Sequence, residues 1–299
     1  MHLPTFDPLG TGLPPAVVAS ARIADELAFD TVWAGDHLVC PAPALDALCA
    51  LAAAAAVTTR VHIGCGVLQL GLRHLVWTAK QLVTLDALAP GRLRLGVGVG
   101  GEYEEEFVAA GVDRRTRGRR LDEMLEVLPA LLMGQSVNHR GPHVEVTSPP
   151  LLPALRSLPP MAVGGRSEAA LHRAARYGDQ WISMWQSPDT MRRHAERLAE
   201  LAAAAGRPTP SVAMLVLAHV DDDARAARLQ AAAALHGQYR LPLEVVDRWT
   251  AYGPAEEVAK LLLDYCAAGA EELLLLPLAA DARTQFERFA VVRQLVETA

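Results

Sequence analysis

The sequence contains few cysteines and no long apolar run. Its four cysteines, at positions 40, 49, 65 and 266, show no paired spacing, so neither a disulfide framework nor a zinc site is indicated. The longest apolar runs, residues 48–57 and 273–280, fall well short of the roughly 20 residues of a membrane-spanning helix. The start, MHLP, also lacks the basic and apolar regions of a signal peptide. These absences predict a protein of the reducing cytoplasm with no membrane partner.

Positive charge is in the minority. The chain has 28 Lys and Arg against 34 Asp and Glu, a formal net charge of −6, whereas a nucleic-acid surface would carry a clustered basic stripe. One basic cluster, RRTRGRR at residues 114–120, has acidic residues on both sides, and we interpret it as a solvated helix start. The run DDD at residues 221–223 indicates a loop and helix cap, since no histidine or further acid is spaced to join it. Neither a nucleic-acid partner nor a metal site is predicted.

Short apolar strands alternate with amphipathic helices along almost the whole chain. The expected strands are residues 2–6, 31–33, 61–68, 92–99, 160–163, 180–184, 212–220 and 272–277. The expected helices are residues 15–29, 44–58, 73–88, 117–133, 167–177, 188–205, 223–235, 254–268 and 282–298. Eight strands, each followed by a helix, predict an α/β fold of the (β/α)8 TIM-barrel type, as one domain over residues 1–299. A segment rich in Pro and Gly, residues 134–158, predicts a small hairpin insertion after the fourth strand-helix region.

In such a barrel, chemistry lies where strands end and the following loops begin. That rule selects Asp36 and His37 after the second strand, residues 65–69 after the third, residues 98–102 after the fourth, residues 164–167 after the fifth, and residues 185–187 after the sixth. Trp185 and Gln186 either line the substrate side of the barrel mouth or only pack against neighbouring side chains. His139 and His143, in the insertion, are candidates to close over the mouth, although loop histidines are usually inert.

Residues 61–101 are the most informative segment, because they read as strand, helix and strand with glycines at both strand ends. Residues 96–101, GVGVGG, formally satisfy the dinucleotide motif G-x-G-x-x-G. That motif needs an acidic residue ending a second strand about 20 residues later, where this chain instead has a basic, amphipathic helix. We therefore reject a dinucleotide site and expect the bare backbone to let another ligand approach.

Five motifs in the same order resemble one known superfamily. They are FDTVWAGDHLV, VHIGCGVLQL with RHLVWTAKQLVTLDALAPGRLRLGVGVG, EEEFVAAGV with RGRRLDEMLEVLPALL, PPMAVGGRSEAALHRAARYGDQW, and YGPAEEVAKLLLDYCAAGAEEL. This combination is similar to the bacterial-luciferase-like flavin oxidoreductases, and closest to the branch that uses the deazaflavin F420. The resemblance implies a barrel whose mouth holds a flavin or deazaflavin ring. It also implies a bulge and a non-proline cis peptide behind the ring, at Gly66-Val67.

The resemblance distributes the cofactor over two groups of residues. The ring is expected against Asp36, Gly66, Val67, Gln69, Gly98, Gly100 and Gly101. The cofactor phosphate is expected at Gly164, Gly165, Arg166 and Ser167, where a helix N-terminus offers bare N–H groups beside a hydroxyl and a cation. Helix capping by Ser167 is the simpler interpretation of the same loop.

Three residues are candidates for catalysis. His37, as a neutral imidazole titrating near pH 6.5, can act as acid or base, although a histidine bonded to a carboxylate can also be structural. Asp36 is placed to orient His37 or to bond the pyrimidine edge of a flavin. Glu102 follows the glycine run, but the F420 enzymes that carry a substrate-protonating acid there have it one position earlier, at the place of Gly101.

The resemblance implies F420-dependent hydride transfer to or from a small organic substrate. The alternatives are a two-component monooxygenase that uses reduced FMN and O2, and a catalytically silent flavin-binding paralogue. A separate flavin or F420 reductase and a homodimer are the expected partners. The loop after the second strand is shorter than in many relatives, which argues mildly against the closed mouth that a monooxygenase needs.

Overall fold

Parallel strands make up the centre of the molecule. The computed structural model describes residues 1–10, 16–279 and 281–299. An eight-stranded sheet runs in the order β1-β2-β3-β6-β7-β8-β10, with β9 paired to β8. Its strands are β1 (Thr31–Ala34), β2 (His62–Leu68), β3 (Leu93–Val97), β6 (Met161–Gly164), β7 (Gln180–Met184), β8 (Ser211–Val220), β9 (Thr250–Gly253) and β10 (Glu272–Pro277). The sheet curls on itself as in a TIM barrel, as the sequence predicted.

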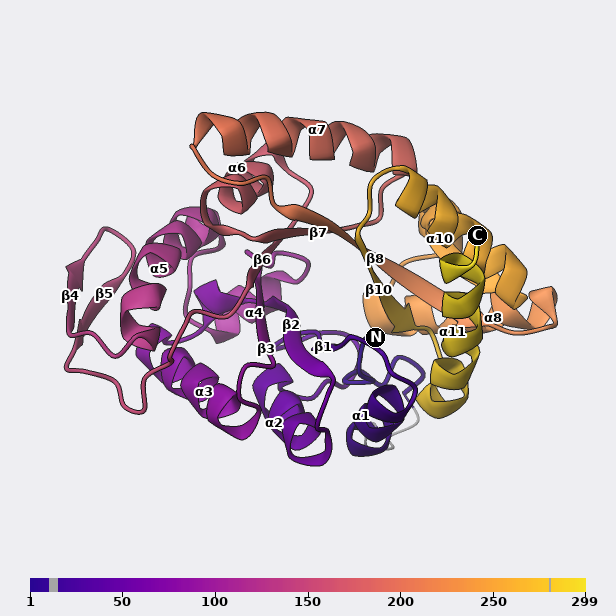
Figure 1. Ribbon diagram of the computed structural model, residues 1–299, viewed down its shortest axis with the longest axis horizontal. Coiled ribbons are helices and arrows are strands. Elements are labelled where there is room, and N and C mark those ends of the chain that lie inside the picture. Colours follow the sequence, from indigo (N-terminus) through magenta and orange to yellow (C-terminus); the bar gives the residue numbers. More distant parts are fainter. Residues whose placement is uncertain (11–15, 280) are drawn as a thin grey trace.

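The first residues of the chain bridge the two edges of this curled sheet. The backbone N–H of His2 donates to Leu275 O of β10 at 2.8 Å, and that of Leu3 donates to Trp33 O of β1 at 2.7 Å. Figure 1 accordingly shows the N-terminus between β1 and β10. The predicted strand at residues 2–6 is therefore in the right place but does not form as a continuous strand, because it makes two isolated bridges, a parallel one from His2 to Trp33 and an antiparallel one from Phe6 to Ala44.

Helices surround the sheet (Figure 1). They are α1 (Val17–Glu26), α2 (Ala47–Val57), α3 (Leu75–Leu88), α4 (Glu104–Ala109), α5 (Arg117–Leu132), α6 (Glu168–Tyr177), α7 (Pro188–Ala204), α8 (Ala224–Tyr239), α9 (Leu243–Val246), α10 (Ala255–Ala267) and α11 (Ala282–Glu297). The side chains of Asp46, Ser167, Ser187, Asp223 and Asp281 cap five of them. The short elements α4, α9 and β9 were not predicted. The start of the predicted first helix, residue 15, lies outside the described residues.

The strands are apolar because both of their faces are covered. In β8 every residue after Ser211 is buried, with helices outside and the barrel interior inside. Trp33 fills the interior beneath the strand ends, and a Cβ at Gly64 would lie only 2.6 Å from its ring. This packing forms a floor beneath the cavity at the carboxyl ends of the strands.

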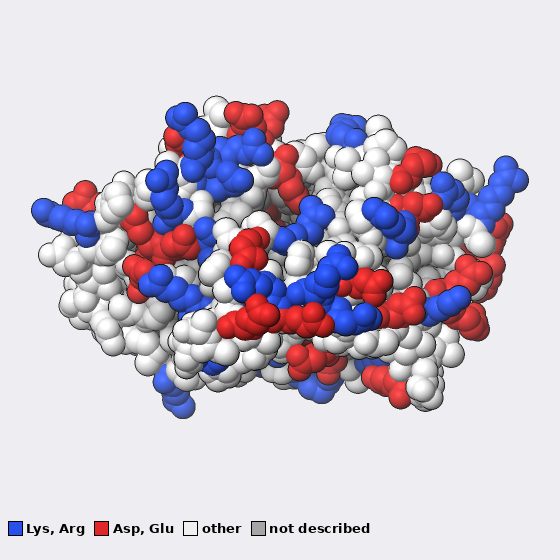
Figure 2. Space-filling model, turned by 90° about the horizontal axis from the view of Figure 1, so that it is seen from above, with Lys and Arg blue, Asp and Glu red and all other residues white. Residues whose placement is uncertain are grey.

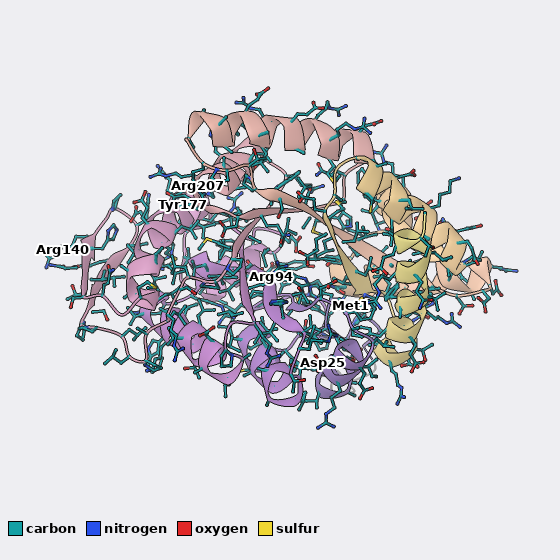
Figure 3. All side chains as sticks on the ribbon, viewed as in Figure 1. Met1, Asp25, Arg94, Arg140, Tyr177 and Arg207 are labelled. Atoms are coloured by element: carbon teal, nitrogen blue, oxygen red, sulfur yellow. The ribbon has the colours of Figure 1, made fainter. Side chains whose placement is uncertain are left out.

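The insertion forms the predicted hairpin from β4 (Val137–Arg140) and β5 (Glu145–Ser148). It packs on α5, where Arg120 Nη1 donates to His143 O at 2.7 Å and the Glu123 carboxylate accepts from Val144 N at 2.8 Å. Arg140 lies at the outer edge of the molecule (Figure 3). The expectation that His139 and His143 close over the mouth is wrong, because the hairpin is held on the outside of α5.

Acidic and basic side chains are interspersed on the face seen from above in Figure 2. Within the described part of the chain, no helix combines the length and apolarity needed to cross a bilayer.

Candidate active site

A cavity of about 290 Å³ lies at the carboxyl ends of the strands. Among the predicted site residues, its lining includes Asp36, His37, Gly66, Val67, Gln69, Gly98, Gly100, Glu102, Gly164, Gly165 and Arg166. Residues that the sequence did not single out also line it, including His2, Phe6, Met184, Leu215, Tyr239 and Leu276. The rule that chemistry follows strand ends thus located the cavity, whereas the residues from inside the barrel carried no sequence signal.

The end of β2 has the local geometry that the resemblance implied. The Gly66-Val67 peptide is cis, and the pairing of β2 with β3 shifts register between Cys65 and Leu68. The Val67 side chain projects between two neighbouring strand ends. A Cβ at Gly98 would lie 2.5 Å from Val67 Cγ2, and one at Gly164 would lie 2.9 Å from Val67 Cγ1. These glycines therefore make room for Val67, which in turn faces the cavity.

His37 lies between two carboxylates. Its Nε2 is 3.2 Å from Glu102 Oε2, and its Nδ1 is 3.1 Å from Glu106 Oε1. Burial lowers the pKa of His37, but its hydrogen bonds to the two carboxylates outweigh burial and raise the pKa to about 9. At neutral pH His37 is therefore an imidazolium with a proton on each nitrogen. The predicted neutral imidazole is wrong, because the sequence did not reveal the second carboxylate.

That second carboxylate, Glu106, lies in the first turn of the short helix α4 and is fully buried. Its Oε1 accepts from Leu38 N at 2.7 Å, and Gln69 Nε2 lies 3.1 Å from its Oε2. Burial raises the pKa of Glu106, but the hydrogen bond to His37 and the positive charge of that ring lower it further, and the net shift is downward. In the sequence, Glu106 lies in the motif EEEFVAAGV, but within an acidic run that resembles a solvated surface, so its burial was not predicted.

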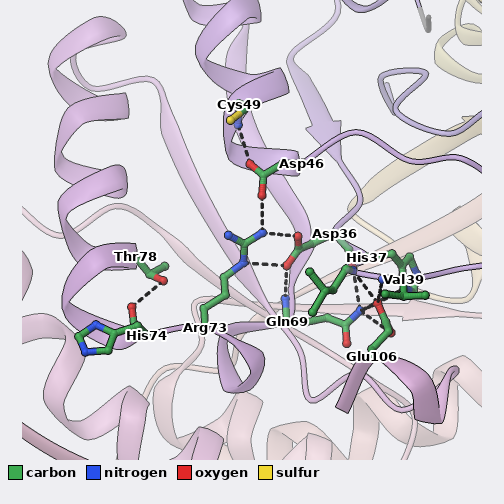
Figure 4. A network of polar contacts seen from close by, with 11 residues as sticks. Asp36, His37, Val39, Asp46, Cys49, Gln69, Arg73, His74, Thr78 and Glu106 are labelled. Carbon is green, nitrogen blue, oxygen red and sulfur yellow. Dashed lines mark hydrogen bonds and ion pairs between the residues drawn. The ribbon is translucent and has the colours of Figure 1, made fainter. Parts of the chain in front are cut away.

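Asp36 does not contact His37 through its carboxylate. Arg73 binds it with two nitrogens, Nη2 to Oδ1 at 2.6 Å and Nε to Oδ2 at 3.2 Å, and Gln69 N donates to Oδ2 at 2.9 Å. Arg73 Nη2 also reaches Asp46 Oδ2 at 2.8 Å (Figure 4). The predicted role of Asp36 in orienting His37 is therefore taken by Glu102 and Glu106, and Asp36 instead fixes Arg73 and the backbone of Gln69.

Gln69 presents an unused acceptor at the cavity. Its Nε2 donates to Asp36 O at 2.8 Å, while its buried Oε1 has no hydrogen-bond partner among the described residues. A Cβ at Gly100 would lie 1.9 Å from this oxygen. An unpaired buried oxygen beside bare backbone fits the edge of a ring that carries N–H donors, so the residues present are compatible with a flavin or deazaflavin.

The predicted phosphate loop lies only partly on the cavity wall. Gly164, Gly165 and Arg166 line the cavity, but Ser167 does not, and its Oγ caps α6 by accepting from Ala170 N at 3.3 Å. Arg166 Nη1 donates to Trp185 O at 2.9 Å. Gly101 also lies off the cavity, because its backbone turns toward Arg114, whose Nη2 donates to Gly101 O at 2.7 Å.

The opposite wall is aromatic. Trp185 has a positive φ of 49° and meets the Tyr239 ring edge-to-face at 5.0 Å between centroids. Gln186, the other residue expected on the substrate side, is buried behind this wall, where Tyr265 donates to its carbonyl at 2.8 Å. Trp185 therefore lines the cavity and Gln186 does not.

Comparisons with known proteins agree with this architecture. A model of the luciferase-like monooxygenase family matches residues 4–244. An uncharacterized protein of Mycobacterium tuberculosis is 34% identical over 168 residues, so the match spans 56% of this chain and 58% of that relative. Two solved structures are similar in fold. One is an F420-dependent secondary alcohol dehydrogenase with an F420–acetone adduct, at a TM-score of 0.84 and 21% identity over 93% of this chain and 94% of that one. The other is the monooxygenase RslO1 from Streptomyces bottropensis, at a TM-score of 0.83 and 23% identity over 100% and 99%.

Proposed function

Because the chain belongs to the luciferase-like monooxygenase family, we propose that it is an F420-dependent oxidoreductase acting on a small organic substrate. The observation that carries this proposal is His37, a cation held between Glu102 and Glu106 on the cavity wall. A poised proton donor beside a ring site suits a reaction in which a hydride and a proton are exchanged with the substrate.

Different cavity residues are suited to hold different parts of the cofactor ring. Val67 would support the ring from behind, and the unpaired Gln69 Oε1 would accept a hydrogen bond from a ring N–H. Gly98, Gly100 and Gly164 leave the backbone bare where a flat ring approaches. When bound, the deazaflavin supplies or accepts the hydride.

The chain's own residues move the proton. In the direction of substrate reduction, His37 Nε2 gives its proton to the substrate heteroatom, while Glu106 retains the proton on Nδ1 in its hydrogen bond. Glu102 is 41% exposed and 3.2 Å from Nε2, so it links His37 to solvent and returns the proton. In the oxidation direction the same groups act in reverse.

A second candidate is a monooxygenase that receives reduced FMN from a separate reductase. The feature that favours it is the positive charge of His37, which would stabilise negative charge developing on a bound oxygen. An F420 reductase would play the corresponding role in the first proposal.

An anaerobic titration of the purified protein with F420, reduced F420, FMN and reduced FMN separates the candidates. We expect saturable binding of the F420 species and none of FMN. Preference for reduced FMN would overturn the F420 proposal in favour of the monooxygenase. Cofactor binding without turnover of any substrate tested, in wild type as in His37→Ala, would indicate a silent flavin-binding paralogue.

We propose a homodimer on the strength of an exposed apolar surface on α3. Trp77 is 71% exposed and Leu88 is 49% exposed on this helix. Light scattering after size-exclusion chromatography tests it: a dimer that Trp77→Glu converts to a monomer supports the interface, and an unchanged dimer places it elsewhere.

A further inference from the structure

A second cavity of about 360 Å³ lies beyond the aromatic wall of the candidate active site. It is lined by Arg166, Trp185, Gln186, Ser187, Thr190, His194, Arg248 and Trp249. The residues come from the loop before α6, the loop after β7, the first turns of α7 and the 3-10 turn Asp247–Trp249. The proposed reaction gives a role to none of them, although Arg166 and Trp185 also line the first cavity.

The two cavities adjoin. Arg166 and Trp185 line both, and the hydrogen bond from Arg166 Nη1 to Trp185 O at 2.9 Å joins the two residues. A single ligand with its reacting part in the first cavity can therefore extend a side chain into the second.

The second cavity is positively charged. Its lining contains two arginines and no carboxylate. Arg248 stacks on Trp249 at 4.5 Å and forms no ion pair with any described residue. Two nearby carboxylates are already engaged, Asp189 with Arg192 at 3.1 Å and Asp247 with Arg228 at 3.0 Å. The cationic charge of Arg166 and Arg248 is thus left for a ligand.

Unpaired buried polar atoms are concentrated in the same lining. Trp185 Nε1, Trp249 Nε1, His194 Nδ1 and Gln186 Oε1 are buried without a hydrogen-bond partner among the described residues. Gln186 is only 4% exposed. Such groups are costly unless something binds them, and four on one cavity point to a polar ligand.

The available groups match an oxyanion. The Ser187 hydroxyl donates to Thr190 Oγ1 at 3.0 Å, as does Arg193 Nη2 at 3.0 Å, so the Thr190 hydroxyl proton is the one without an acceptor among the described residues. Thr190 lies at the N-terminus of α7, a 17-residue helix whose dipole favours negative charge. Arg166 and Arg248 add positive charge. Gln186 Oε1, an acceptor, suits the hydroxyl of a singly protonated phosphate or of a neighbouring alcohol.

We propose that the second cavity binds the phosphate or carboxylate group of a ligand whose reacting part lies in the first. The assignment of that ligand as cofactor or substrate rests on the proposed function, whereas oxyanion binding itself does not. The proposed site also gives Arg166 a role, because Arg166 lines the second cavity and donates to Trp185 O. Ser167, the next residue of the predicted phosphate loop, only caps α6.

Isothermal titration with inorganic phosphate at constant ionic strength tests the site. We expect saturable binding that Arg248→Gln weakens about tenfold, as expected for loss of a charge-assisted contact. Arg225→Gln is the matched control, because Arg225 is exposed, forms no ion pair with a described carboxylate and is not among the lining residues. Absence of saturable phosphate binding, or equal affinities in the two variants, would overturn the proposal.

Two further titrations identify the source of the anion. Wild type and Arg248→Gln are titrated with F420 and with its deazaflavin chromophore lacking the phosphate side chain. If Arg248→Gln weakens F420 but not the chromophore, and phosphate competes with F420, the group belongs to the cofactor. If F420 affinity is unchanged and phosphate binds alongside it, the group belongs to the substrate; both results support the site.

The outcome remains separable from the proposed function. Failure of every flavin and deazaflavin to bind would refute the oxidoreductase but leave the phosphate isotherms intact. Normal F420 binding, together with a phosphate affinity that Arg248→Gln does not change, would refute the oxyanion site in the second cavity but leave the proposed oxidoreductase intact.

Discussion

Charged side chains are paired on one side of the active-site region and unpaired on the other. On the side of β1, β2 and α4, the charges of Asp36, Arg73, His37 and Glu106 are all paired, and a chain of hydrogen bonds joins them (Figure 4). On the side of α7, Arg166 and Arg248 have no carboxylate partner among the described residues. Paired charges fix geometry before a ligand arrives, whereas unpaired ones gain most when it binds.

Glu106→Ala should cause the largest loss of stability on the side where the charges are paired. It leaves the His37 cation, Leu38 N and Gln69 Nε2 without their buried partner, which should cost about 3–5 kcal/mol of unfolding free energy. Urea denaturation measures the loss. Glu104→Ala, on the same helix but 75% exposed at its side chain, is the control and should change stability by less than about 0.5 kcal/mol. Equal losses in both variants would contradict the comparison.

Raising the pH should weaken the same side without any mutation. The pKa of His37 is raised to about 9 from 6.5, so its stabilisation is complete below pH 6.5 and is lost as the pH rises through 9. A shift of this size corresponds to about 3 kcal/mol. The difference in unfolding free energy between wild type and His37→Gln, measured from pH 6 to pH 10, should shrink over that interval. A constant difference would show that His37 is not charged in the folded protein.

Asp46→Ala should have a smaller effect, because it removes only the outer partner of Arg73 and the cap of α2. Arg73 keeps its two contacts to Asp36. We expect a loss of about 1 kcal/mol from the missing cap and little change in cofactor affinity. Thermal unfolding and a cofactor titration measure the two quantities, and a large drop in affinity would show that Asp46 shapes the cavity.

Thr190→Glu should remove the difference between the two sides, because it places a carboxylate in the cavity that Arg166 and Arg248 line. Position 190 is the third residue of α7, where Glu can bond back to the N-cap Ser187, so stability should rise by about 0.5 kcal/mol. Phosphate binding should disappear at the same time. Thr190→Gln, which has the same shape without the charge, should retain much of the binding. Strong phosphate binding by Thr190→Glu would contradict the assignment of the second cavity.

Much of the architecture could be predicted because local patterns determine it. Apolar strands and capped helices gave the barrel, and the strand-end rule gave His37, Val67 and Gly98. The pairing of distant side chains could not be read in the same way. Glu106 lies in an acidic run that resembles solvent-exposed surface, yet it is fully buried because His37 and two backbone N–H groups bind it. Arg248 gave no signal, since its role depends on which carboxylates its neighbours already bind.

The bridge made by the first residues has a consequence for folding. His2 donates to Leu275, so this closure joins residues from opposite ends of the chain. During synthesis, the barrel cannot close until β10 has emerged, and the free edge of β1 stays open to pairing until then. Because the contact joins residues far apart in the sequence, we expect closure of this seam to be a slow, non-local step of folding.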